Sequence, residues 1–138
     1  MSESARPHVL VVDDDKDIRK IVKLTLTHLG GVHVIDVGSG PEALEWVKQR
    51  RFELIILDMC MPHMDGEMTL RELHKLPNTE KVPIVFLTAH APSQLSESLE
   101  PWGVKLILEK PFEPISFNRH IKEILSKGQD GANNKASQ

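Results

Sequence analysis

Side chains that could do chemistry stand directly after four separate apolar runs of this sequence. They are Asp13, Asp14 and Asp15 after the first run, and Asp58, Thr88 and Glu109-Lys110 after three later ones. Carboxylate oxygens are the ligands that Mg²⁺ prefers, and a carboxylate beside this cation can attack phosphorus because the metal offsets the repulsion between two anions. A lysine can pair with the transferred phosphoryl group, and a threonine hydroxyl can donate to one of its oxygens. These residue types indicate magnesium-assisted phosphoryl chemistry, if the fold brings them together.

The elements that must position these residues alternate along the chain. Five apolar runs rich in β-branched residues are typical of strands covered on both faces, and helical spacing fills the segments after them. The runs are 8–12, 32–37, 54–57, 84–87 and 104–108. This alternation predicts an α/β fold of (βα)₅ type, a doubly wound parallel sheet with right-handed crossovers. Ligands bind beyond the carboxyl ends of such strands, so the polar positions are expected to converge at one edge.

Five helices are expected between and after the strands. The first and last carry apolar stripes, which consist of Ile18, Ile21, Val22, Thr25 and Leu29 in the first and Phe117, Ile121, Ile124 and Leu125 in the last. Ser39, Pro41 and Glu42 have the pattern of an N-cap, a first-turn proline and a capping glutamate, which begins the second helix. The third is expected within 66–76 and the fourth within 92–100, where the apolar pattern is weak.

Length and composition bound the class of protein. The 138 residues suit one domain, and the net charge of −3 gives no electrostatic reason to expect direct nucleic-acid binding. Cys60 is the only cysteine, so no disulfide can form within the chain. The amino terminus lacks a signal-peptide pattern and no apolar stretch approaches the roughly 18 residues of a membrane helix, so we expect a cytoplasmic protein without membrane insertion. Residues 128–138 hold no apolar side chain larger than alanine, so we expect one domain over 1–127 and a disordered tail or linker start at 128–138.

Four stretches together resemble the signature stretches of bacterial two-component receiver domains, the phosphoacceptor domains of response regulators. They are VLVVDDD, LIILDMCMPHMDG, IVFLTAH and LILEKPF, and the resemblance runs from about His8 to Lys127. It implies a flavodoxin-like fold with the strand order 2-1-3-4-5 of the chemotaxis receiver. It also implies a phosphorelay signalling switch rather than an enzyme, with an aspartyl phosphate as the signalling state.

The resemblance assigns roles to particular residues. It implies Asp58 as phosphoacceptor, and Asp13, Asp14, Asp58 and the backbone carbonyl of Cys60 as ligands of Mg²⁺. It implies Thr88 as the switch hydroxyl, Ala89 as a backbone donor to the phosphoryl group, Lys110 as its counter-ion and Pro111 as a cis-proline.

The resemblance also implies partners. The donor would be a histidine kinase or a histidine phosphotransfer protein. The fourth helix, fifth strand and fifth helix would present the altered surface to an effector protein or an output domain outside this chain.

One position departs from the family pattern. Tyrosine or phenylalanine often stands three residues before the lysine, where this chain has Ile107. Coupling of Thr88 to an aromatic rotamer is therefore not expected here. Cys60 and His90 occupy positions that tune phosphoryl lifetime in the family.

A different class also uses a strand-end aspartate with Mg²⁺, namely phosphatases of the haloacid-dehalogenase type. The run from Asp13 to Asp17 imitates their D-x-D-x-T/V motif, but Asp17 stands where threonine or valine is required. That interpretation leaves LDMCMPHMDG unexplained and remains the alternative. Repeated turnover of a phosphate ester would support it, whereas a stoichiometric aspartyl phosphate would support the switch.

Overall fold

The computed structural model describes residues 6–29, 31–77, 79, 81–89 and 100–137. Five strands form one parallel sheet in the order β2-β1-β3-β4-β5. The strands are β1 (His8–Val12), β2 (His33–Val37), β3 (Leu54–Asp58), β4 (Ile84–Thr88) and β5 (Val104–Glu109). The helices are α1 (Lys16–Leu29), α2 (Gly40–Gln49), α3 (Gly66–Leu73) and α4 (Pro114–Ser137), with a short 3₁₀ turn, η2 (Glu100–Trp102). The predicted α/β class and strand order are confirmed.

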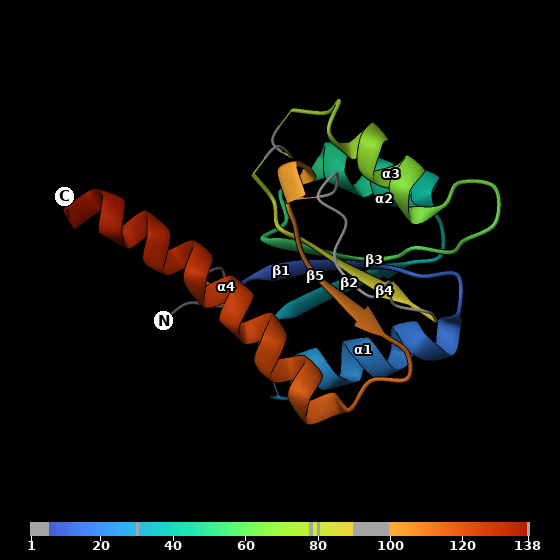
Figure 1. The fold of residues 1–138 in the computed structure, drawn as a ribbon, viewed down its shortest axis with the longest axis horizontal. Coiled ribbons are helices and arrows are strands. Elements are labelled where there is room, and N and C mark those ends of the chain that lie inside the picture. Colours follow the sequence, from blue (N-terminus) through green and yellow to red (C-terminus); the bar gives the residue numbers. More distant parts are fainter. Residues whose placement is uncertain (1–5, 30, 78, 80, 90–99, 138) are drawn as a thin grey trace.

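Helices cover both faces of the sheet, with α1 and α4 on one face and α2 and α3 on the other (Figure 1). Each face therefore has its own apolar cluster, and the alternate residues of a strand contribute to different clusters. Leu10 of β1 belongs to the α2–α3 side, whereas its neighbours Val9 and Val11 belong to the α1–α4 side. All residues of β3 and β4 are buried, as expected of strands in the middle of a two-sided sheet.

Side-chain caps begin the helices that flank the carboxyl ends of β1, β2 and β3. Asp15 accepts hydrogen bonds from the backbone N–H groups of Asp17 at 2.9 Å and Ile18 at 3.4 Å, which places it as the N-cap of α1. Ser39 accepts from the N–H of Glu42 at 3.4 Å and caps α2, as its spacing predicted. The glutamate itself bonds the N–H of Gly38, one residue earlier than a capping box requires.

The prediction that Ile21 belongs to the buried stripe of α1 is wrong. Ile21 is 44% exposed, whereas Val22 and Leu26 are fully buried and Thr25 is 8% exposed. Val22, Thr25 and Leu26 follow helical i, i+3, i+4 spacing and face the sheet, so Ile21 is turned toward the edge of that stripe and faces solvent.

Two expectations concern the carboxyl-terminal half of the chain. The helix expected at 92–100 falls mostly on residues 90–99, outside the described part of the chain; only its last residue is described, at the start of η2. The backbone of α4 continues to Ser137, through the segment expected to be a disordered tail. A helix can propagate through a polar segment because each added residue contributes one backbone hydrogen bond once the helix exists. The domain boundary at residue 127 remains a prediction.

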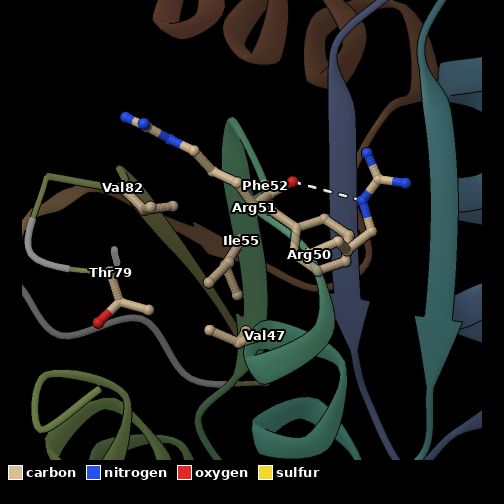
Figure 2. A pocket seen from close by; sticks show the side chains of 7 residues that line it. All are labelled: Val47, Arg50, Arg51, Phe52, Ile55, Thr79 and Val82. Atoms are coloured by element: carbon tan, nitrogen blue, oxygen red, sulfur yellow. Dashed lines mark hydrogen bonds between the residues drawn. The ribbon is translucent and has the colours of Figure 1, made fainter. Parts of the chain in front are cut away.

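A small hollow lies at the sheet end opposite the polar positions. Figure 2 shows a hollow there, between the end of α2 and the starts of β3 and β4, with Val47, Ile55 and Val82 pointing into it. Its volume is about 10 Å³, enough for roughly one water molecule. In the described part of the chain, no helix has the length and apolar character that crossing a bilayer requires.

Candidate functional site

Three carboxylates meet at the carboxyl ends of β1 and β3. Asp13, Asp14 and Asp58 each offer an oxygen, and these oxygens lie within 4.8 Å of one another. The two strands are neighbours, with Val12 in register with Leu57, which brings the ends together. Asp13 is 0% and Asp58 3% exposed, whereas Asp14 faces solvent. Such a donor set, part buried and open on one side, fits a cation that takes few protein oxygens and keeps its other positions for water or phosphate.

The ammonium group of Lys110 faces the buried carboxylates. Lys110 follows β5, and its Nζ lies 2.8 Å from Asp13 Oδ2 and 3.5 Å from Asp58 Oδ2. Its backbone N–H donates to the Thr88 carbonyl at 2.7 Å, which ties the end of β5 to the end of β4. The bond from Lys110 to Pro111 is cis, as the resemblance implied. The lysine is thus already paired, more closely with Asp13 than with Asp58.

The loop after β3 holds Asp58 through its backbone. The N–H of Cys60 donates to Asp58 Oδ1 at 3.2 Å, and the N–H of Gly66 donates to the Met59 carbonyl at 3.1 Å. A β-carbon on Gly66 would lie 2.5 Å from the Asp58 carbonyl oxygen and 2.8 Å from Met59 Cα. Only glycine permits this approach, because a β-carbon there would displace the backbone that carries Asp58.

The remaining predicted residues lie at the same edge. Thr88 ends β4, is 4% exposed and is in register with Glu109. Ala89 follows directly and is exposed, as is the Cys60 side chain. The roles of Thr88, Ala89 and the Cys60 carbonyl toward a phosphoryl group or a metal remain predictions. Arg19, whose Nη1 donates to the Asp13 carbonyl at 2.7 Å, was not anticipated, because no strand-end signal marks it.

Comparison with known proteins assigns the family. A family model described as "Response regulator receiver domain" matches residues 9–122. The chain belongs to this family. A probable chemotaxis protein CheY of Rhizobium etli is 32% identical over 112 residues, which cover 81% of this chain and 87% of that protein. The structure of the chemotaxis protein CheY4 of Vibrio cholerae covers 87% of this receiver domain and is itself covered to 99%, with 30% identity and a TM-score of 0.80.

Receiver domains also occur inside much longer proteins. The histidine-protein kinase BarA of Escherichia coli is 36% identical over 105 residues, which cover 76% of this chain and 11% of the kinase. This receiver domain therefore spans about a tenth of the length of that relative. Members of the family are signalling switches of two-component systems and not enzymes of the usual kind. They bind Mg²⁺ at an acidic pocket, and the cluster of Asp13, Asp14 and Asp58 is the candidate for that pocket here.

Burial and charge set the protonation of this receiver domain's site. Desolvation and, next in size, the adjacent carboxylate of Asp13 together raise the pKa of Asp58 from 3.8 to about 6, against smaller lowering effects of the Cys60 N–H and of Lys110. Partial burial lowers the pKa of Lys110, but its hydrogen bond and charge interaction with Asp13, followed by those with Asp58, outweigh this and leave the pKa raised. Without a cation, the charged form of Asp58 is therefore less favourable in the folded protein than in the unfolded chain, and the group takes up its proton near pH 6 rather than near pH 4.

We expect the stability of the metal-free receiver domain to fall as pH rises from about 4 to about 6. A carboxyl group whose pKa is higher in the folded state than in the unfolded state stabilises the fold when it is protonated. The contribution of Asp58 is therefore complete below pH 3.8 and is lost as the pH rises to about 6. The loss should be on the order of 1–3 kcal/mol. Urea unfolding of the wild type and of Asp58→Asn would measure it, since the asparagine variant should be the more stable near pH 7.5 and lack this step.

Proposed function

We propose that this receiver domain is a switch that accepts a phosphoryl group on Asp58. The observation that carries the proposal is the setting of that side chain. It is a buried carboxylate whose Oδ1 accepts the Cys60 N–H at 3.2 Å, while Oδ2 faces Lys110 Nζ at 3.5 Å. Oδ2 lies on the side where a phosphoryl group would find a counter-charge, and two further carboxylates stand beside it.

The proposed transfer uses the chain's own groups in defined ways. A carboxylate oxygen of Asp58 forms a bond to phosphorus as the bond between phosphorus and the donor nitrogen of a phosphohistidine breaks, and the donor imidazole leaves with that electron pair and takes a proton from solvent. Lys110 then pairs with the phosphoryl oxygens instead of Asp13, and Thr88 and the N–H of Ala89 donate to them. Asp13, Asp14, Asp58 and the Cys60 carbonyl would hold Mg²⁺, which supplies the positive charge that two anions need to approach each other.

The proposed donor is a histidine kinase or a histidine phosphotransfer protein, and the proposed recipient of the signal is an effector protein or an output domain outside this chain. Membership of the receiver family and the similarity to the BarA kinase support this. A phosphatase that uses Asp13 as its nucleophile is less well supported, because Lys110 Nζ pairs with Asp13 Oδ2 at 2.8 Å, more closely than with Asp58 Oδ2 at 3.5 Å.

The decisive experiment is incubation with Mg²⁺ and a small phosphodonor such as acetyl phosphate, followed by intact mass measurement. We expect at most one phosphoryl group per chain, and none in the presence of chelator. The linkage should be an acyl phosphate, which is stable in acid and labile in base. Continuous hydrolysis of a phosphate ester without a labelled protein would instead identify an enzyme.

The output step gives a further prediction. Ile107 is half-buried against the α2–α3 side of the core, in register with Phe86, and its β-branched side chain has restricted χ1 freedom. We therefore expect phosphorylation to act through Thr88 and to change the surface near Trp102 and Lys105. Thr88→Ala should accept the phosphoryl group yet lose most of the conformational response, whereas Ile107→Val should keep it.

Amide exchange with and without beryllofluoride, a phosphoryl mimic, would measure this response in the three proteins. Changes largest around Ile107, or an undiminished response in Thr88→Ala, would contradict it.

A further inference from the structure

Arg19 of α1 contacts the backbone of the acidic site rather than its carboxylates. Its Nη1 donates to the carbonyl oxygen of Asp13 at 2.7 Å, and its Nε donates to Asp36 Oδ2 on β2 at 3.1 Å. The side chain is only 21% exposed, and Asp36 is 27% exposed. The guanidinium thus connects the end of β1 to β2 from the helix that follows the acidic residues.

The carbonyl that Arg19 binds belongs to the peptide group between Asp13 and Asp14. That group is planar, so a donor on its oxygen restrains the amide of Asp14 as well. The N–H of Asp13 donates to the Val37 carbonyl at 3.1 Å, which holds the same residue from its other side. The Asp13 carboxylate itself accepts the N–H of Asp15 at 2.9 Å, so these bonds together hold the residue that presents a buried carboxylate beside the exposed one of Asp14.

We propose that Arg19 is a positioning residue for the metal site, which holds the Asp13–Asp14 peptide so that both carboxylates reach one cation. The inference rests on the proposed function, since it assumes that Asp13 and Asp14 bind Mg²⁺. Arginine suits the task because its planar fork bonds two acceptors at a fixed angle, which a lysine ammonium cannot do.

The chain offers a matched control in Lys23. Its Nζ also reaches Asp36, at 3.4 Å from Oδ1, but its side chain is 50% exposed and forms no hydrogen bond or ion pair with Asp13 among the described residues. Arg19→Gln and Lys23→Gln therefore remove the same charge from the same helix, and each loses a bond to Asp36. Loss of a nearby positive charge should by itself strengthen binding of a cation, so weaker binding in one variant alone reports a change of position.

Gly38 provides a second variant that keeps the arginine. A β-carbon there would lie 3.1 Å from Arg19 Nη1, so Gly38→Ala should displace the guanidinium by a few tenths of an ångström without removing it. This variant guards against the case in which Arg19→Gln does not fold.

The experiment is calorimetric titration of Mg²⁺ into the full chain, at a temperature where every variant is shown to be folded. We expect roughly tenfold weaker binding in Arg19→Gln, as is typical when the partner that orients a metal ligand is removed. Arg19→Lys should recover part of the loss, Gly38→Ala should show a smaller loss, and Lys23→Gln should bind as tightly as the wild type or more tightly. In metal-free protein the Asp14 amide resonance should move in Arg19→Gln and stay in Lys23→Gln.

The outcomes separate two failures. If the wild type binds no Mg²⁺ and takes no phosphoryl group, the proposed function fails and this inference with it. If the wild type binds Mg²⁺ and Arg19→Gln binds it equally well, only the positioning role is overturned, even where the variant unfolds at a lower temperature.

Discussion

Asp58→Asn should take up no phosphoryl group from a phosphorylated kinase or from acetyl phosphate. The amide oxygen is a poor nucleophile, whereas the wild-type carboxylate becomes fully available once a cation and Lys110 face it. The variant should fold, because asparagine is close in shape to aspartate and keeps an oxygen for the Cys60 N–H that bonds Asp58 at 3.2 Å. The loss should therefore be one of chemistry and not of structure.

Intact mass measurement after incubation with the phosphodonor would show the difference directly. Asp15→Asn is the matched control, since Asp15 belongs to the neighbouring acidic run but caps α1, a role that asparagine also fills. That control should be labelled like the wild type. Undiminished stoichiometric labelling of Asp58→Asn would remove Asp58 from the acceptor role.

Joint replacement of Asp13 and Asp14 by alanine should abolish Mg²⁺ binding and phosphorylation together. The two carboxylates complete the acidic cluster with Asp58, and Mg²⁺ binds poorly to one carboxylate alone when no phosphate is present. We expect no binding heat at millimolar Mg²⁺ and no labelled chain. In the wild type, Mg²⁺ should raise the melting temperature, because it binds only the folded state.

The metal-free double variant serves as its own test of the electrostatics. Removing Asp13 removes a neighbouring carboxylate that raises the pKa of Asp58, so titration of Asp58 should move toward its ordinary value. Phosphorylation that persists in the double variant, or in wild type with chelator, would show that the metal assignment is wrong.

The sequence alone determined the fold class and the edge of the sheet at which chemistry could occur. Continuous apolar runs define strands, and the residue after each run must lie at a carboxyl end when the strands are parallel. Asp13, Asp58, Thr88 and Lys110 could therefore be named without coordinates. The capping role of Ser39 could be predicted as well, since a cap depends on hydrogen bonds within one helical turn.

Only the tertiary structure decided which of these residues are buried and which groups they contact. Adjacent aspartates look alike in sequence, yet Asp13 is fully buried and Asp14 is exposed. Lys110 lies closer to Asp13 than to Asp58 because the strand order brings together groups that are distant in the chain. Arg19 follows Asp13 by only six residues, and the placement of α1 turns its guanidinium to the Asp13 carbonyl. Ile21 faces solvent because it lies at the margin of the apolar stripe that packs on the sheet. Helical periodicity indicates a stripe, but which side chains of its margin are covered depends on the elements packed against it.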